Sequence, residues 1–401
     1  MVNDIIIYLN VKKVEGETVK NEKFFIDNRE FNAENVLIIA ELGSSHAADP
    51  VKARELIDAA AEAGADCVKF QIIHANEILH PNTGDVPLPG GKIRLYDRFM
   101  QLELPPAFFE DMKERAEKKG LIFLCSAFGL QSARELVSIN PKCVKIASPE
   151  LNYTALLKEI ASYGLPTILS TGVSKLGDIE EALSVFTEKG LAGEKKAEIC
   201  LLHCVTAYPA PETDYNLTVL SSLQAIFGVS VGVSDHSLDP CLVPVLATAM
   251  GASVIEKHFC LSRFDSGLDD PIALPPDAFA QMVHSIRQAS KLGPEETLKA
   301  MYRERGRDLV ENVLGDGVKR LAPSEILNYE RTNRSIHAVR DIPKGESIKK
   351  EMIASLRTEK VLRPGLPPSW EERIIGCRTE AFIPAGEGIR FKDLVTLNLG
   401  V

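Results

Sequence analysis

The 401-residue sequence lacks the marks of several protein classes. Its eight cysteines are scattered without a C-x-x-C pair, which is typical of free thiols, so we expect a reducing, cytoplasmic location. No apolar run approaches the roughly 18 residues of a membrane span, and residues 1–4 carry no basic leader segment. Lys and Arg number 46 against 56 Asp and Glu, a net charge of −10. We therefore expect neither a membrane nor nucleic acid as a partner.

A regular alternation of short and long apolar patterns fills most of the chain. The short runs lie at residues 36–40, 67–71, 121–125, 143–146, 166–170, 198–203, 229–233 and 253–257. Amphipathic helical segments lie between most of them, for example at 51–63, 106–119, 154–163 and 179–189. This alternation predicts a parallel α/β sheet, and eight units in about 250 residues are typical of a (β/α)8 TIM barrel. A doubly wound open sheet is the alternative, but no G-x-G-x-x-G follows the first strand.

Composition divides the chain into an N-terminal extension, a barrel, a linker and a C-terminal domain, at residues 1–35, 36–292, 293–330 and 331–401. Two alternating apolar runs, at 5–11 and 23–26, predict a hairpin that covers the closed end of the barrel. The linker is charged and is expected to be helical and partly exposed. Turn signals predict a small β-rich C-terminal domain, in which DIPKGE (341–346) and FIPAGE (382–387) indicate one turn used twice.

Polar or ionisable residues follow every predicted strand of the barrel. In chain order they include Glu41, Lys69, Gln71, Ser126, Lys145, Ser148, Glu150, Ser170, His203, Tyr208, Ser234, His236, Glu256 and His258. Reactive groups of a TIM barrel belong at the carboxyl ends of its strands. A barrel built only for packing would not place such residues at all eight ends, so the pattern predicts an active site.

Two histidines, His236 and His258, follow neighbouring strands, which lie roughly 5 Å apart. Two imidazoles at this separation can share one divalent ion, although each could also be an ordinary core histidine. Nitrogen and oxygen donors without a thiolate favour manganese, magnesium or iron(II) over structural zinc. His203 is a possible third ligand, but we expect it to be a buried orienting group.

Two lysines, Lys69 and Lys145, come from the second and fourth strands and are expected to face the same mouth. With serine hydroxyls around them they predict a cradle for a phosphate or a carboxylate. Salt bridges to Glu41 or Glu150 are the purely structural alternative. A Schiff-base lysine is a third one, but carboxylates nearby favour lysines that stay protonated.

Several of these motifs, taken in order, closely resemble the sialic acid (N-acetylneuraminate) synthases. They are IIAELG (38–43), VKFQ (68–71), KIASPE (145–150), LSTG (169–172), LLHCVTAYPAP (201–211), GVSDH (232–236), EKHF (256–259) and the pair Asp269-Asp270. The resemblance covers residues 36–292. The tail is similar to the family's small antifreeze-like (SAF) domain in RSI (334–336) and IPKGE (342–346).

The resemblance implies condensation of phosphoenolpyruvate with an N-acyl-mannosamine-type sugar, giving a nine-carbon 2-keto acid and phosphate. It implies a divalent metal ion, manganese ahead of magnesium or cobalt, on His236 and His258. The family's phosphoenolpyruvate-binding positions correspond to Lys69, Gln71, Ser126, Lys145, Ser148, Ser170 and Ser234. Positions that contact the sugar or the reacting atoms correspond to Glu41, Glu150, Tyr208 and Asp269. Catalytic roles are thereby expected for Glu41, Lys69, Lys145, Glu150, His236 and Asp269.

The identity of the sugar stays open at this point. Thr206 stands where the family often has Asn, and the loop at 88–96 lacks the Asn often found near the sugar amide. Synthases of legionaminic or pseudaminic acid are therefore the alternative within the family. A metal-dependent pyruvate aldolase or barrel hydrolase is a remoter one, because it would not need two lysines with serines. A scaffold whose tail binds ice or carbohydrate is the non-enzymatic alternative.

A domain-swapped homodimer is expected from the tail. The linker at 293–330 is long enough to leave its own barrel, and a tail of about 70 residues is expected to dock somewhere. The resemblance places Arg334 at a position where a tail arginine reaches a neighbouring active site and binds the substrate. An exposed arginine on a tethered module is the alternative.

Overall fold

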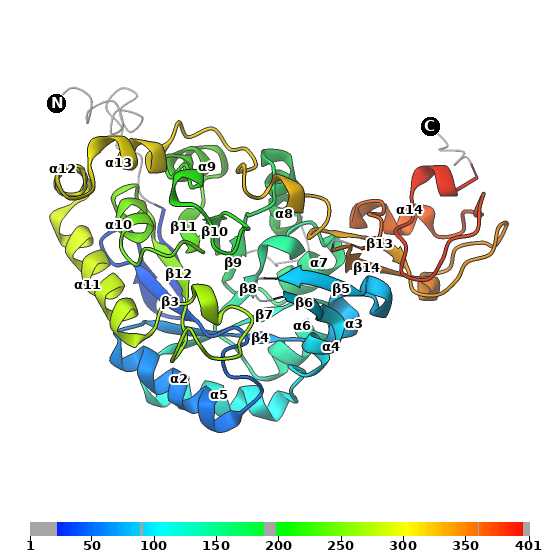
Figure 1. The fold of residues 1–401 in the computed structure, drawn as a ribbon, viewed down its shortest axis with the longest axis horizontal. Helices are drawn as coiled ribbons and strands as arrows, with labels where there is room; N and C mark the ends of the chain where they lie inside the picture. The colour runs from blue at the N-terminus through cyan, green and yellow to red at the C-terminus, as the bar shows by residue number, and fades with distance from the viewer. Residues whose placement is uncertain (1–21, 89–90, 188–197, 360, 396–401) are drawn as a thin grey trace.

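The computed structural model describes residues 22–88, 91–187, 198–359 and 361–395, and it contains a closed eight-stranded parallel barrel (Figure 1). In spatial order the barrel strands are β10 (Ile199–Cys204), β11 (Ser230–Asp235), β12 (Val254–His258), β3 (Leu37–Glu41), β4 (Cys67–Ile72), β7 (Ile122–Ala127), β8 (Val144–Ile146) and β9 (Thr167–Ser170). The predicted TIM barrel is confirmed, and each predicted strand lies within two residues of an observed one.

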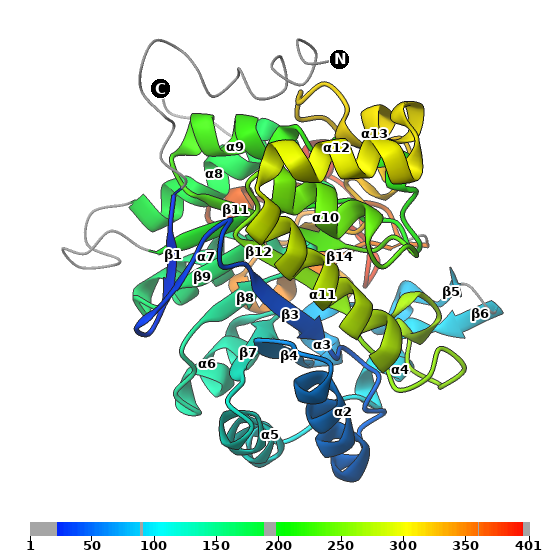
Figure 2. The ribbon, with the colours of Figure 1, turned by 90° about the vertical axis from the view of Figure 1, so that its left-hand side faces the viewer.

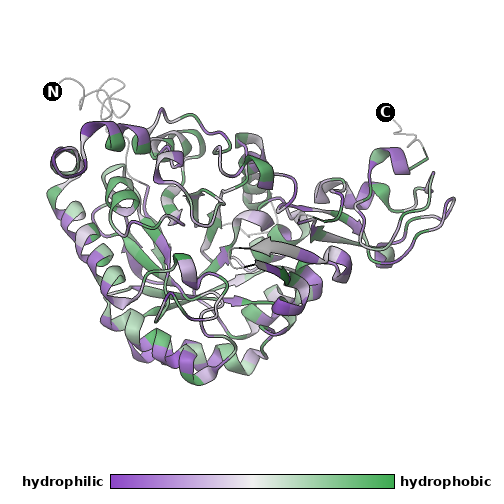
Figure 3. Cartoon of the chain, viewed as in Figure 1, coloured by the Kyte–Doolittle hydropathy of each residue, from purple (hydrophilic) through white to green (hydrophobic). Residues whose placement is uncertain are grey.

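Helices surround the barrel on its outer side (Figures 1 and 2). They are α2 (Pro50–Glu62), α5 (Pro106–Lys118), α6 (Leu130–Ser138), α7 (Thr154–Ser162), α8 (Leu176–Thr187), α9 (Val219–Phe227), α10 (Leu242–Ala249) and α11 (Pro276–Leu292). Figure 3 shows hydrophobic residues along the strands and hydrophilic ones on the outer helices. No helix in the described ranges is long and apolar enough to cross a membrane.

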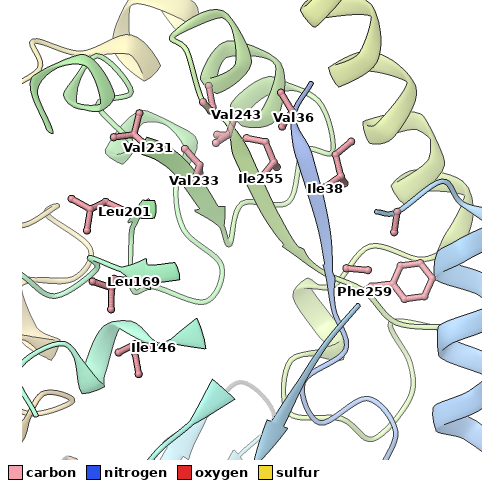
Figure 4. Packing of buried hydrophobic residues seen from close by; sticks show 14 of the residues in the cluster. Val36, Ile38, Ile146, Leu169, Leu201, Val231, Val233, Val243, Ile255 and Phe259 are labelled. Atoms are coloured by element: carbon pink, nitrogen blue, oxygen red, sulfur yellow. The ribbon is translucent and has the colours of Figure 1, made fainter. Parts of the chain in front are cut away.

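Two apolar layers hold the barrel together. Side chains that point outward from the strands, such as Ile38, Val233 and Ile255, share a cluster with Val243 of α10 (Figure 4). Side chains that point inward at the base of the barrel, such as Ile39, form a second cluster. Because both faces of each strand are buried there, the strands are continuous apolar runs in the sequence.

An N-terminal hairpin closes the base of the barrel, as predicted, but with different strands. Strand β1 (Phe24–Ile26) pairs with β2 (Arg29–Phe31) around a tight turn at Asp27. Phe24, Ile26 and Phe31 belong to the inner basal cluster and are at most 1% exposed. The predicted run at 5–11 lies outside the described residues, and the observed partner of β1 is the next segment of the chain.

The linker packs on its own barrel over much of its length. Helices α12 (Pro294–Arg305) and α13 (Arg307–Leu314) are helical as predicted, and Leu298, Val310 and Val313 are buried in the barrel's outer cluster. The chain then passes over the loops that follow β9 and β10 before it enters the tail. The linker therefore packs on the barrel as an additional layer and is not a free tether.

The tail has a small core of its own, built on β13 (Arg334–Ala338) and β14 (Ile353–Arg357), which pair antiparallel. The predicted repeat is visible as contact between its two copies, since Ile342 and Ile383 exchange backbone hydrogen bonds of 2.9 Å. Further elements are the mouth hairpin β5 (Asp85–Leu88) and β6 (Gly91–Arg94) with helices α3 (Ala75–Ile78) and α4 (Leu95–Met100), and α14 (Glu371–Ile374) in the tail. Strand β14 contacts α3, so the tail docks at the barrel mouth.

Candidate active site

A cavity of about 930 Å³ opens at the carboxyl ends of the barrel strands. Eleven of the residues expected from the sequence line it: Glu41, Lys69, Gln71, Lys145, Ser148, Ser170, Tyr208, Ser234, His236, His258 and Asp269. The parallel register explains their convergence, because it aligns Glu41 with Lys69 and Ser234 with Glu256. Side chains two residues apart share one face of a strand, so the inward positions change from apolar at the base to ionisable at the mouth.

A buried charge network forms the floor of this cavity. Lys69 Nζ lies 2.8 Å from Glu256 Oε1 and 3.1 Å from Glu41 Oε2. Lys145 Nζ lies 3.7 Å from Glu256 Oε1 and donates to Ser170 Oγ at 2.6 Å. Each of these charged side chains is at most 6% exposed. Charges so far from water are stable only in pairs, which explains why two lysines and two glutamates occur together.

The network shifts the pKa values of its members in different directions. Burial would raise the pKa of Glu256, but Lys145 and Lys69 outweigh it and lower this pKa to about 2. Burial raises the pKa of Glu41 to about 7, against the opposing effect of Lys69. Burial also lowers the pKa of Lys145 to about 8, whereas for Lys69 the two carboxylates outweigh burial and raise the pKa. Both lysines are therefore cations at neutral pH.

The two histidines form a pair at one side of the cavity. The ring centroids of His236 and His258 lie 5.4 Å apart, and His236 Nδ1 lies 2.9 Å from the carbonyl oxygen of Val205. If that nitrogen donates to the carbonyl, Nε2 is left as an acceptor for a metal. Burial lowers the pKa of His258, which keeps this ring neutral. Burial acts to lower the pKa of His236 as well, but the Cys204 side chain and the Val205 carbonyl outweigh it and raise this pKa. Two imidazoles in the neutral form, with water and substrate oxygens, would fit an open divalent site.

Within the described ranges, no group of three or more His, Cys, Asp or Glu side chains has a geometry that could hold a metal ion. His203 points away from the cavity, and its Nε2 lies 2.6 Å from the carbonyl oxygen of Tyr215. The hydroxyl of Tyr215 in turn accepts the backbone N–H of His236 at 2.7 Å. His203 is thus a buried group behind the pair, and its contact with Tyr215 favours the expected orienting role over that of a third ligand.

Tyr208 and Asp269 lie beside the histidine pair. The ring of Tyr208 stacks on His236 at 4.3 Å between centroids, and a cis peptide bond joins Tyr208 to Pro209. Asp269 Oδ2 lies 3.9 Å from His258 Nδ1. These two residues place an aromatic face and a carboxylate next to the histidine pair.

Three expected site residues are not in the cavity lining. Glu150 is buried behind it, where its Oε1 accepts from Arg334 Nε at 3.1 Å and from Arg357 at 2.7 Å. Arg334 also donates to the carbonyl oxygen of Phe128 at 2.6 Å and is 1% exposed. In this single chain Arg334 is thus bound by its own barrel, and the expectation that it reaches the active site of a second chain stays a prediction. Ser126 lies deeper in the barrel, and its buried hydroxyl has no hydrogen-bond partner.

Sequence analysis missed the roles of two residues at the site. Glu256 is the central acceptor of the charge network, and its place two residues before His258 on one strand face could have indicated this. Arg357 from the tail lines the cavity and is held by Glu150. The position of Arg357 depends on how the tail docks on the barrel. No local sequence pattern indicates this docking.

An apolar wall faces the polar strand ends across the cavity. It consists of Ile73, Ile78, Ile93, Leu95, Phe99, Leu102 and Phe128. These side chains come from α3, β6, α4 and the loops that follow β4, α4 and β7. A ligand that fills the cavity thus meets charge at one end and hydrocarbon at the other.

Comparison with known proteins places this architecture in a family. Residues 56–296 match the NeuB family and residues 333–395 match the SAF domain. The chain is 35% identical to N,N'-diacetyllegionaminic acid synthase of Campylobacter jejuni, over 77% of this chain and 86% of that protein. It is 32% identical to pseudaminic acid synthase of the same species, over 90% and 98%.

A solved structure agrees over nearly the whole length. The spore coat polysaccharide biosynthesis protein SpsE of Bacillus subtilis superposes with a TM-score of 0.77 at 33% identity, over 94% of this chain and 100% of that one. The barrel and the tail thus recur together in a related protein. The chain belongs to the NeuB family of sialic, legionaminic and pseudaminic acid synthases, and it carries a C-terminal SAF domain.

Proposed function

We propose that the protein condenses phosphoenolpyruvate with an N-acylated amino sugar to give a nine-carbon 2-keto acid and phosphate. In this reaction the enol carbon of phosphoenolpyruvate bonds to the sugar aldehyde carbon, water adds at the former enol carbon, and phosphate leaves by C–O cleavage. The observation that carries the proposal is one cavity that holds two buried lysines at its floor and two histidines at its side.

The lysine end of the cavity suits phosphoenolpyruvate. Lys69 and Lys145 supply positive charge, and Gln71, Ser148, Ser170 and Ser234 supply polar groups on the same strand ends. The unpartnered hydroxyl of Ser126 lies on the strand between them. A ligand with a phosphate and a carboxylate would bind here through charge-assisted hydrogen bonds. It would also relieve the competition of two lysines for Glu256.

The histidine end suits the sugar aldehyde. His236 and His258 would hold a divalent ion, for which manganese is our first candidate, and the bound ion would polarise the aldehyde. Tyr208 and Asp269 would orient the sugar there. Glu41, with a pKa of about 7, is able to give or take a proton near neutrality while water adds. Glu150 acts in this scheme as a positioning residue that holds Arg357.

For the acceptor we propose a bis-acylamino trideoxy sugar of the legionaminic or pseudaminic type. N-acetylmannosamine, the acceptor favoured by the sequence resemblance, becomes the second candidate. The apolar wall suits the methyl groups of a deoxy carbon and a second acyl group, whereas an additional sugar hydroxyl would lie unpaired against it. Relatives named as synthases of legionaminic and pseudaminic acid support the same choice.

Release of phosphate tests the reaction directly. The purified protein with manganese and phosphoenolpyruvate is given N-acetylmannosamine or the diacetamido trideoxy hexoses, and phosphate and the 2-keto acid are quantified. Equal amounts of both products are expected. Turnover with free pyruvate in place of phosphoenolpyruvate would instead indicate an aldolase, and absence of phosphate with every sugar would contradict the proposal.

We also propose a homodimer in the cytoplasm. The tail exposes several large apolar side chains, among them Val361, Phe382 and Phe391, each at least 51% exposed. A second copy of the chain would cover them. Arg334 does not take part in this proposal. Light scattering of the eluting peak in size-exclusion chromatography would report a mass near twice 44.0 kDa, whereas a monomer at micromolar concentration would contradict it.

A further inference from the structure

A buried carboxylate of the linker contacts the barrel outside the cavity. Glu325 is 1% exposed, and its Oε2 accepts the backbone N–H of Val173 at 3.0 Å and of Thr206 at 2.9 Å. Its Oε1 accepts the N–H of Ala322 at 3.1 Å. One carboxylate therefore ties the linker to the loops that follow β9 and β10.

Two amide side chains complete this attachment. Asn328 Nδ2 donates to the carbonyl oxygen of Thr206 at 2.9 Å, and Asn333 Nδ2 donates to that of Val173 at 2.9 Å. Both backbone groups of Thr206 and of Val173 are thus bound by residues from outside the barrel. Val173 has a φ of 41°, a left-handed conformation that a β-branched residue adopts only under constraint.

The backbone held in this way carries the histidine side of the cavity. Val205, directly before Thr206, supplies the carbonyl that contacts His236 Nδ1, and Tyr208, two residues after it, stacks on the same ring. The neighbouring loop, which follows β9, is also held in place, because the Gly172 N–H donates to Ser148 Oγ at 3.0 Å. A Cβ at Gly172 would lie 2.2 Å from Thr206 Oγ1. A shift of Thr206 would therefore move several site groups together.

We infer that Glu325 is a positioning residue for the reaction. Through the backbone of Thr206 and Val173 it fixes the carbonyl that orients His236 and the ring that stacks on it. Glu325 is not part of the cavity lining, so it acts without touching substrate. This inference rests on the proposed function, because that function gives His236 and Tyr208 their roles.

Two substitutions at this position separate geometry from simple stability. In Glu325→Gln the amide oxygen can still accept from Val173 and Thr206, whereas Glu325→Ala leaves both N–H groups unpaired. We expect Glu325→Ala to lower kcat at least about ten-fold, since a 1 Å misplacement can cost about a hundred-fold. Glu325→Gln should stay within about three-fold of the parent. The KM for phosphoenolpyruvate should change less, because Glu256 and Ser170 hold the lysines.

A second readout does not depend on turnover. Binding of Mn²⁺ to the metal-free protein, followed by electron paramagnetic resonance of free Mn²⁺, should weaken in Glu325→Ala because His236 loses its fixed orientation. Asp214→Ala is the matched control, since Asp214 accepts the adjacent N–H of Ser324 at 3.0 Å and does not bind Thr206 or Val173. Its kcat and Mn²⁺ affinity should match the parent.

Several outcomes would overturn the inference. One is a parental kcat and Mn²⁺ affinity in Glu325→Ala. Another is an equal loss in Asp214→Ala, which would indicate that linker docking in general, and not Glu325, sets the activity. If Glu325→Ala does not fold, Asn333→Ala replaces it, because Asn333 binds the carbonyl oxygen of Val173 and does not line the cavity. This variant should lower kcat about three-fold, and a parental kcat there would overturn the inference. A parent protein that releases no phosphate contradicts the proposed function instead, and Mn²⁺ binding then still decides the role of Glu325.

Discussion

The two ends of the barrel are built from the same strands but contain opposite chemistry. At the base, inward positions such as Leu37, Ile122 and Val254 join the N-terminal hairpin in an apolar core. Two or four residues later on the same strand faces stand Glu41, Ser126 and Glu256. The apolar base excludes water from below, so the charges above it interact in a medium of low dielectric. The base therefore supplies stability and also sets the strength of the electrostatic interactions at the mouth.

The largest expected effect is loss of the histidine pair. His236→Ala or His258→Ala should reduce turnover by at least about a thousand-fold, since the aldehyde loses its polarising ion. The melting temperature should change little, because both residues lie at the mouth rather than in the basal core. Phosphate release and Mn²⁺ titration measure the two effects. Normal turnover of either variant in metal-free buffer would remove the metal from the proposal.

Removal of the central carboxylate should damage both activity and stability. Glu256→Gln leaves Lys69 and Lys145 without their shared partner, so the free energy of unfolding should fall by about 3–5 kcal/mol. Turnover should fall about a hundred-fold, because the positions of both lysines change. Urea unfolding and initial rates measure these quantities. A variant with unchanged stability would show that water reaches the network, contrary to the low dielectric inferred here.

Substitution of one lysine should act mainly on phosphoenolpyruvate. Lys69→Met or Lys145→Met should raise its KM or lower kcat by about ten-fold or more, since each removes a cation that faces an anionic ligand. Lys257→Met is a matched control, because Lys257 pairs with Asp235 at 2.6 Å, is equally buried and does not line the cavity. The control should lose stability without a change in this KM.

The KM for phosphoenolpyruvate should depend on pH through Lys145. Burial lowers the pKa of Lys145 to about 8, so the cation is present below that pH and KM should rise up to about ten-fold per unit above it. The free energy of unfolding should depend on pH in the favourable direction. The unfolded chain binds this proton more tightly than the folded protein does, so stability should rise between about pH 8 and 10. Lys145→Arg should remove this pH dependence, because arginine stays charged.

The smallest effect on activity is expected at the base. Leu124→Ala opens a cavity in the basal core and should lower the free energy of unfolding by about 2–5 kcal/mol. At temperatures where the protein stays folded, kcat and both KM values should match the parent. A large kinetic change would mean that the base also shapes the mouth, and the contrast between the two ends would not hold.

Sequence alone predicted the features that repeat along the strands. The eight strands were recognisable because both of their faces are buried, and the strand-end residues followed from the barrel geometry. The predicted hairpin partner at 5–11 lies outside the described residues, so that pairing stays a prediction. The observed partner, Arg29–Phe31, was not predicted because this short segment is largely charged and has no apolar pattern. The contacts of Glu150 and Arg334 were missed because they join residues 184 positions apart.

The ion pairs of Glu150 also bear on the order in which the protein assembles. The barrel strands and Glu150 are synthesised first, whereas Arg334 and Arg357, the cations that hold this buried carboxylate, leave the ribosome only after the whole barrel. Until then the mouth lacks Arg357 and the carboxylate is without these partners, so the nascent barrel cannot present a finished site. Completion of the active site is thereby linked to synthesis of the tail, and a product truncated before the tail would be a barrel without Arg357 at its mouth.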